Sequence, residues 1–192
     1  LRHEGDSAVL ELTQTKGAGT EEQAPSEMVI PLRIALFDRE TGRNLREELV
    51  ILDVPEKRVC FDGFAEAPVL SINRGFSAPI ILDNRRDPAD LAFLSAHEDD
   101  PFARFEAMQQ LMIDHLVGQI GGEAGDEGLI VDSIAAALDE EGIDRAFLAE
   151  MVQPPAESFL GEQMLVIDPA AIHAARAGLR KTIATRLKDR WQ

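Results

Sequence analysis

Two His-Glu pairs are the residues whose type and spacing come closest to a metal-dependent hydrolytic site. A zinc peptidase uses His-Glu-x-x-His, because histidines one helical turn apart reach one face and the glutamate between them activates a water molecule. His3-Glu4 is followed by Gly-Asp-Ser, and His97-Glu98 is followed by Asp-Asp-Pro. Neither pair has the second histidine, so the sequence predicts no metal ligand at either one.

The acidic run after His97 allows two interpretations. Glu98, Asp99 and Asp100 have the carboxylate oxygens that a divalent cation prefers. We favour a solvated acidic turn that caps the next helix, because Asp before Pro is ordinary helix-start chemistry. Ser95, His97 and Asp99 are also close in sequence, but catalytic triads are assembled from distant segments and are recognised by geometry. We therefore assign no triad here.

The other candidates have structural interpretations. The glycine-rich segment 118–128 lacks the Lys-Ser/Thr of a P-loop and the spacing of a dinucleotide fingerprint, so we predict a surface loop that does not bind phosphate. His115 and His173 have no Cys or second His spaced to join them as ligands, and we expect structural or surface histidines. Met108 and Met112 are expected in a core. We thus expect no catalytic, cofactor-binding or metal-binding residue in this chain.

The net charge excludes several kinds of partner. The 192 residues include 19 Lys and Arg against 35 Asp and Glu, a formal net charge of −16. Such an acid repels nucleic-acid phosphates and anionic membranes, so we expect neither as a partner. The apolar fraction of 45% is enough for a folded core. Basic residues near the C-terminus are interpreted as complements of a helix dipole: Arg176, Arg180, Lys181, Arg186, Lys188 and Arg190.

The single cysteine and the absence of targeting patterns indicate the compartment. Cys60 stands between Val59 and Phe61 in a strand-like run, where a thiol usually behaves as a small buried hydrophobe. One cysteine allows no intramolecular disulfide, which suits a reducing compartment. No window approaches the roughly 18 apolar residues of a membrane span, and no signal-peptide pattern is visible. We expect a cytoplasmic protein.

The first part of the chain has the period of strands. In residues 28–37, Met28, Ile30, Leu32, Ile34 and Leu36 share one face, while Arg33 lies on the other and Pro31 favours an edge or a bulge. Short strands separated by frequent turns predict an antiparallel β-sandwich. Further strands are predicted over residues 9–16, 48–54, 57–61, 69–73 and 79–82.

After Asp87 the period changes to that of helices. Asp87-Pro88, Asp100-Pro101 and Asp168-Pro169 each combine a capping side chain with a residue suited to the first helical position. Shorter helices are predicted over 130–138 and 146–152. Two apolar stripes define the longer helices, one through Phe102, Phe105, Met108, Met112 and Leu116, the other through Ile172, Leu179, Ile183, Leu187 and Trp191.

These periods predict an α+β chain of two domains, a sandwich over residues 1–86 and an all-α segment over residues 87–192, in which helix pairs suit a solenoid. The first carries 11 basic and 15 acidic side chains and the second 8 and 20, so the helical part is the acidic one. The chain starts at Leu1 rather than Met and its last apolar stripe stops at Trp191 without a Gly cap. We expect a segment of a longer protein.

Several segments, taken in order, carry a family resemblance over nearly the whole chain. They are Phe61-Asp-Gly-Phe64 and the residues 68–80 (PVLSINRGFSAPI), 91–111 (LAFLSAHEDDPFARFEAMQQL), 143–151 and 167–180. This series resembles bacterial aminopeptidase N, a family of zinc-dependent, thermolysin-like (gluzincin) metallo-aminopeptidases of the membrane alanyl aminopeptidase type. The family more often has Trp where this chain has Phe105, a change that affects only local packing.

The resemblance implies a place in a four-domain protein. The chain is similar to the Ig-like third domain and the start of the C-terminal helical superhelix. The zinc ligands, the general-base Glu and the Gly-Ala-Met-Glu-Asn motif lie in the family's catalytic domain, and none of these motifs occurs here. The chain is then a non-catalytic part that links the catalytic domain to a helical cap restricting substrate access, with those domains and, through the parent, peptides as partners.

Two other hypotheses stay open. A free-standing sandwich–helix interaction module without enzymatic activity would have its start and stop codons at these boundaries. A stand-alone hydrolase needs a nucleophile or a metal cluster, and the sequence offers neither. If the chain is a fragment, surface that its parent buries is exposed, so self-association is expected of it in isolation.

Overall fold

The structure is a computed structural model that describes residues 1–15, 28–83, 86–123 and 125–191, and it divides into two compact units. The first unit comprises Leu1–Asn84 with Glu98–Ala103, and the second comprises Arg85–His97 with Arg104–Gln192. None of the helices within the described ranges is long and apolar enough to cross a membrane.

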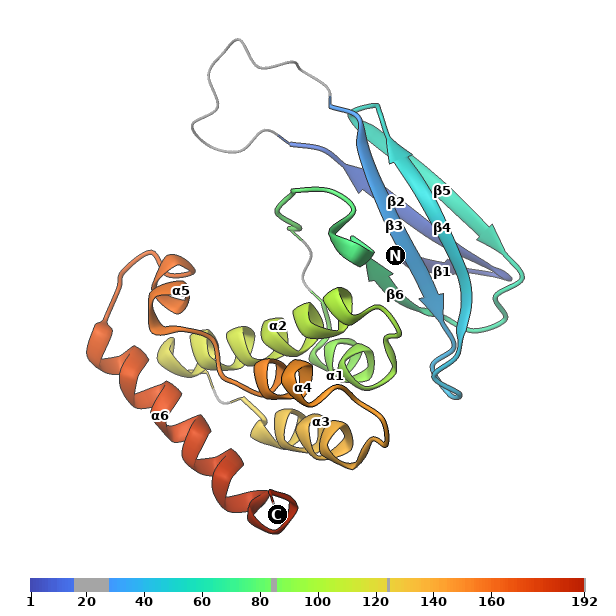
Figure 1. Ribbon diagram of the computed structural model, residues 1–192. Coiled ribbons are helices and arrows are strands. Elements are labelled where there is room, and N and C mark those ends of the chain that lie inside the picture. Colours follow the sequence, from blue (N-terminus) through green and yellow to red (C-terminus); the bar gives the residue numbers. More distant parts are fainter. Residues whose placement is uncertain (16–27, 84–85, 124, 192) are drawn as a thin grey trace. The chain divides into compact units, whose positions relative to one another are not determined.

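Two antiparallel sheets form the first unit (Figure 1). One has the order β1-β2-β5 and consists of β1 (Arg2–Glu4), β2 (Ser7–Thr13) and β5 (Glu56–Asp62). The other has the order β4-β3-β6 and consists of β4 (Asn44–Leu52), β3 (Ile30–Phe37) and β6 (Val69–Ile72). Side chains from both sheets share one core: Ala8, Leu10, Leu32, Ile34, Leu36, Val50, Leu52, Phe61, Phe64 and Ile72. The predicted sandwich is confirmed.

Strand β3 follows its predicted faces. Leu32, Ile34 and Leu36 are buried in the core, while Arg33 is exposed. Strand β6 pairs with β3 only from Ile34 onward, so Pro31 faces a free side where the missing N–H breaks no ladder. Met28 is the exception to the predicted face, since it precedes the strand and is 61% exposed.

Several strands differ from the predictions, among them β4, which spans Asn44–Leu52 instead of residues 48–54. The strand expected over 79–82 is wrong, because these residues pair with nothing and the side chain of Ile81 is 98% exposed. An apolar run forms a strand only where a partner edge is available. Residues 79–82 pair with no strand of the described ranges, although Ile80 packs against the core of the sandwich. The strand expected over 9–16 ends at Thr13 in β2, and Lys16 lies outside the described residues. Strand β1 was not predicted.

Cys60 is exposed, so the prediction of a buried thiol is wrong. Strand β5 alternates, and the burial of Phe61 in the core places its neighbour Cys60 on the outer face with Arg58 and Asp62. The larger apolar side chain determined which face of the strand turned inward.

The Asp-Pro signals start helices as predicted. Helix α1 (Pro88–His97) begins after Asp87, α2 (Pro101–Ile120) after Asp100, and α6 (Pro169–Arg186) after Asp168. Each carboxylate accepts a backbone N–H of the first turn, at 2.9 Å from Ala89, 2.9 Å from Ala103, and 3.0 Å from both Ala170 and Ala171. These bonds satisfy donors that a helix start leaves free.

The remaining helices are α3 (Glu127–Asp139), α4 (Arg145–Met151) and α5 (Glu157–Glu162), with the short 3-10 turn η2 (Lys188–Arg190) near the end. Helices α3 and α4 confirm the two shorter predictions. Helix α5 was not predicted, because its six residues are too few to show a period. The segment 118–128 is only partly a loop, since α2 continues to Ile120 and α3 starts at Glu127.

The second unit has its own core, with α3 in contact with both α1 and α6. Met108 and Met112 are fully buried in it, as expected. The stripe of α6 is buried at Ile172, Leu179, Ile183 and Leu187, but the helix ends at Arg186 and Trp191 is 46% exposed. The prediction that the final helix reaches Trp191 is therefore wrong, because the α-helix ends before the 3-10 turn η2, which precedes Trp191.

We expect Phe61→Ala to lower the free energy of unfolding by about 3–5 kcal/mol, because it leaves a cavity in the core of the sandwich. The neighbouring change Cys60→Ala should stay within about 0.5 kcal/mol, because its side chain faces solvent. Urea denaturation of both variants measures the difference. Equal losses would contradict the assignment of the two faces of β5.

Candidate functional site

The most extensive polar cluster described in the first unit is built on the turn that follows β6. Asn73 adopts a left-handed conformation with φ of 63°, which Asn tolerates better than most residues. Its side chain holds the turn closed, since Oδ1 accepts the Ala78 N–H at 2.9 Å and Nδ2 donates to the Ala78 carbonyl at 3.1 Å. Gly75, with φ of 60°, lets the chain turn again directly after Arg74. The turn thereby fixes the direction of the Arg74 side chain.

Arg74 is the centre of this cluster, and only 4% of its surface is exposed. Its Nε and Nη2 donate to Glu98 Oε1 at 3.1 and 2.9 Å. Its Nη1 lies 2.6 Å from Glu47 Oε2, and Nη2 also pairs with Asp99. The Glu98 side chain has no exposed surface. A buried guanidinium is thus surrounded by carboxylates from β4 and from the segment before α2.

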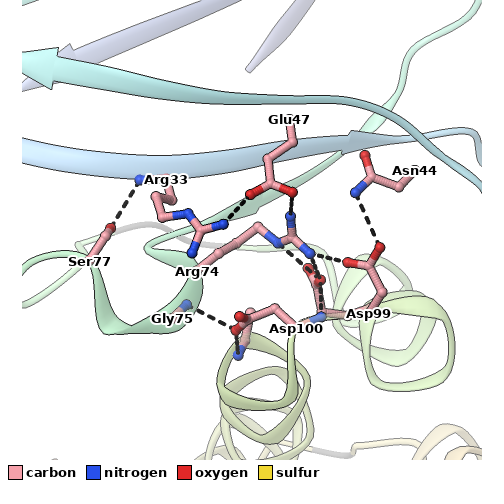
Figure 2. Close-up of polar contacts among 10 residues, drawn as sticks. Arg33, Asn44, Glu47, Arg74, Gly75, Ser77, Asp99 and Asp100 are labelled. Atoms are coloured by element: carbon pink, nitrogen blue, oxygen red, sulfur yellow. Dashed lines mark hydrogen bonds and ion pairs between the residues drawn. The ribbon is translucent and has the colours of Figure 1, made fainter.

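The residues around Arg74 extend the network (Figure 2). Arg33 Nη2 lies 2.5 Å from Glu47 Oε1, so this carboxylate bridges two guanidinium groups. Glu98 Oε1 also accepts the Asp100 N–H at 2.8 Å. Asp100 Oδ1 accepts the N–H groups of Gly75 and Ala103, each at 2.9 Å. One carboxylate therefore caps α2 and holds the turn after β6 at the same time.

The pKa shifts follow from this arrangement. Burial raises the pKa of Glu98, against the opposing effect of its hydrogen-bond donors and of Arg74. The hydrogen bond from Arg33 lowers the pKa of Glu47. Burial acts to lower the pKa of Arg74, but the charges of Glu98, Asp99 and Glu47 outweigh it and raise that pKa. Arg74 is accordingly a permanent cation.

The prediction for the acidic run after His97 is partly wrong. His97 is exposed and Asp100 caps the next helix as expected, but Glu98 is buried rather than solvated. The cation beside these carboxylates is Arg74, which lies 24 residues away from Glu98 in sequence. Ser95 donates to the Ala92 carbonyl within its own helix at 2.7 Å, and no hydrogen bond to His97 or Asp99 is recorded for it.

No local pattern marked Arg74 or Glu47, and Arg33 was predicted only to lie on the outer face of its strand. A weak signal was present, because Arg74 stands in Asn-Arg-Gly directly after an apolar strand, where a charged residue needs a partner if it is buried. The identity of that partner depends on contacts between distant segments. Periodicity gives no information about such contacts.

His173 lies at the surface, whereas His115 is nearly buried and its Nε2 has no hydrogen-bond partner among the described residues, so a structural role for His115 stays a prediction. His3 Nε2 lies 2.7 Å from the Phe64 carbonyl, and the exposed His173 Nδ1 lies 2.9 Å from Glu157 Oε1. The His115 side chain is only 6% exposed, with Nε2 3.8 Å from Glu127 Oε1.

A pocket of about 370 Å³ lies within the second unit, beside His115. Its polar side chains are mostly acidic. Burial raises the pKa of Asp114, and the positive charge of Arg86 opposes this shift. The lining residues are Pro88, Leu111, Asp114, His115, Gly118, Glu123, Gly125, Asp126, Leu129 and Ile130.

The described ranges bring together no group of three or more His, Cys, Asp or Glu residues placed to hold a metal ion. The Arg74 cluster combines two arginines with four acidic side chains, and the backbone donors of Gly75 and Asp100 within it are already bonded. Such a network positions chain segments, and we assign no chemical step to it.

Both units match known protein families. Residues 2–85 match a family model described as "Domain of unknown function (DUF3458) Ig-like fold", and residues 88–192 match one described as "Domain of unknown function (DUF3458_C) ARM repeats". The chain belongs to this family of Ig-like and ARM-repeat domains. The predicted fold class, an Ig-like sandwich followed by a helical ARM-like segment, is confirmed.

The relatives in this class are aminopeptidases. The chain is 40% identical over 77% of its length to the aminopeptidase N of Caulobacter vibrioides, and 27% identical over 97% to that of Escherichia coli. These matches span 18% and 23% of the relatives, so the chain corresponds to about a fifth of their length. The predicted resemblance to bacterial aminopeptidase N is confirmed.

A solved structure has the same fold. It is the Legionella pneumophila aminopeptidase A in complex with aspartic acid, which covers 96% of this chain with a TM-score of 0.83 and 22% identity. The match spans 21% of that chain.

We expect Arg74→Gln to lower the free energy of unfolding by about 3–5 kcal/mol at pH 7, because it leaves buried carboxylates without their cation. Arg33→Gln is the matched control. Its side chain is 52% exposed, so the loss should be no more than about 1 kcal/mol. Urea denaturation measures both, and a similar loss for the two variants would contradict the central position of Arg74.

The raised pKa of Glu98 predicts a direction for the pH dependence of stability. The folded chain holds a proton at this carboxyl more tightly than the unfolded chain. Its contribution to stability is therefore fully present below the ordinary pKa of 4.5 and is lost as pH rises through the folded pKa. The unfolding free energy of the wild type minus that of Glu98→Gln should therefore fall as the pH rises above 4.5.

Denaturant unfolding at several pH values measures this difference. Glu66→Gln, which changes an exposed carboxyl of the same unit, controls for the general effect of removing one acid. If the difference grows with pH instead, Arg74 lowers the pKa of Glu98 by more than burial raises it.

Proposed function

We propose that this chain is a non-catalytic scaffold segment of a zinc-dependent aminopeptidase of the N type, which removes N-terminal amino acids from peptides. The observation that carries the proposal is the continuous similarity of both units to aminopeptidases N, at 40% identity to the Caulobacter protein. Zinc would supply the hydrolytic chemistry of the parent. The described residues offer no set of ligands for it, and by the family resemblance it would bind in the catalytic domain of the parent.

The physical properties of the two units support this role. The first unit is a closed sandwich whose ion-pair network has buried components, which suits a rigid connection between domains. The second unit is helical, and residues 87–192 carry 8 basic and 20 acidic side chains. As part of a cap over an active site, it would restrict access and attract the free α-ammonium group of a peptide.

The remaining expectations belong to the same proposal. The partners of the chain would be the catalytic domain and the further helices of its own parent, and peptides would be met only through that parent. A cytoplasmic location accords with a single cysteine and the strong net negative charge.

The test compares this chain with the full-length product of its gene. We expect the full-length protein to hydrolyse an alanine anilide and to lose that activity when a chelator removes zinc, whereas this chain alone gives no hydrolysis. Turnover by this chain alone would contradict the assignment of no catalytic residue. A gene whose start and stop codons coincide with residues 1 and 192 would support the free-standing interaction module instead.

A further inference from the structure

The pocket beside His115 has the size and the apolar lining of a small-molecule site. Its volume of about 370 Å³ falls within the roughly 300–1,000 Å³ that such sites occupy. All of its lining residues belong to the second unit, and they come from α2, α3, the segment between them and the first residue of α1. The apolar side chains among them are Pro88, Leu111, Leu129 and Ile130.

Negative charge predominates among the polar groups of this pocket. Asp114, Glu123 and Asp126 contribute three carboxyl groups, and none of the described lining residues is Lys or Arg. Arg86 acts on Asp114 by its charge but does not line the pocket. Burial nevertheless raises the pKa of Asp114, so the ionised form of this carboxyl would gain from a further cation beside it.

The three carboxyl groups differ in their partners. Asp114 Oδ1 accepts a hydrogen bond from Gln110 at 2.6 Å, and Asp126 Oδ1 accepts the Gly128 N–H at 2.7 Å. For the Glu123 side chain no hydrogen bond or ion pair to another described residue is recorded. The structure therefore leaves one carboxylate at the pocket available to a ligand.

His115 adds a polar group without a partner. Its side chain is only 6% exposed, and its Nε2 is buried with no hydrogen bond to any part of the chain that the structure describes. The nearby Glu127 Oε1 lies 3.8 Å away, which is beyond hydrogen-bond distance. The ring is closely covered, because a Cβ built on Gly125 would overlap Nδ1. A buried nitrogen without a partner costs free energy, which a donor from a ligand would recover.

We propose that this pocket binds a small organic cation, a primary ammonium group carried on a compact aliphatic body. An ammonium group has three N–H donors and no acceptor, which matches the carboxylates of Asp114 and Glu123 and the imidazole nitrogen of His115. The aliphatic body would contact apolar side chains such as Leu111 and Ile130. The inference stands on the second unit alone and does not rest on the proposed function.

Other classes of ligand fit this pocket less well. The described side chains include no group of three or more His, Cys, Asp or Glu placed to hold a metal ion. An anion would meet three acidic side chains, which costs free energy through the repulsion of like charges. A neutral apolar molecule would leave the polar groups of the pocket without partners.

The test titrates this chain with three probes of similar size and different charge. Cyclohexylmethylamine is a cation at about pH 8, cyclohexylmethanol is neutral and cyclohexanecarboxylate is an anion. We expect the amine to bind at least about tenfold more tightly than the other two, because hydrogen bonds between charged groups discriminate by that much. In NMR spectra of the ¹⁵N-labelled chain, the backbone amides of Gly118 and Gly125 should shift as the amine binds.

Three variants locate the binding. Glu123→Gln removes one charge with little change of shape and should weaken amine binding at least about fivefold. Glu150→Gln, an exposed acid on α4 that does not line the pocket, is the matched control and should leave the affinity within about twofold. Gly118→Leu places a side chain beside Glu123 and should abolish binding, while leucine suits a helical position better than glycine. Urea denaturation checks that each variant is folded.

Several results would overturn the proposal. If the amine does not bind saturably, or binds no more tightly than the alcohol, the pocket is not a site for an organic cation. Equal weakening by Glu123→Gln and Glu150→Gln would show attraction to the overall negative charge of the chain. Undiminished binding to a folded Gly118→Leu chain would place the amine elsewhere. Loss of binding in the full-length product of the gene would mean that the parent itself fills or covers the pocket.

Discussion

A buried guanidinium is the constraint on which the first unit depends. Arg74 lies in the interior with its charge, and a charge removed from water is tolerated only with partners at short distance. Glu47 and Glu98 come from segments far apart in sequence, so satisfying one side chain fixes a strand and the start of a helix against the same turn. The left-handed backbone conformation of Asn73 contributes to this arrangement, because it sets the direction of the Arg74 side chain.

The second unit is stabilised mainly by helix capping and apolar packing. Its helices begin at capping aspartates and bury apolar stripes, so local hydrogen bonds and non-directional packing carry most of its order. Arg104 provides its main directional contact, with Nε donating to the Ser95 carbonyl at 2.8 Å and the guanidinium paired with Glu140. The hydrogen bond from Arg104 lowers the pKa of Glu140, which keeps that pair charged. Arginines thus join segments distant in sequence in both units, among them Arg74 in the first and Arg104 and Arg190 in the second.

Both arrangements suit a protein part whose function is to hold other parts. Most polar groups of the Arg74 cluster are paired with one another, although Glu98 Oε2 is buried without a hydrogen-bond partner in the described part of the chain. The excess of acidic side chains lies in residues 87–192, whereas exposed apolar side chains occur on both units. The similarity to about a fifth of each aminopeptidase N accords with this division between scaffold and chemistry.

The sequence by itself determined the sandwich, the change to helices, the three Asp-Pro helix starts and the inward face of β3, because each depends on residues within one turn or one strand. Tertiary structure decided the rest. Cys60 faces outward because the larger apolar side chain of its neighbour Phe61 is buried in the core. Residues 79–82 form no strand because they pair with no strand edge within the described residues. Glu98 is buried because Arg74 is, and a pairing between groups 24 residues apart is set by how the chain folds back. Local sequence patterns do not show which charged residue from a distant segment will pair with a buried one.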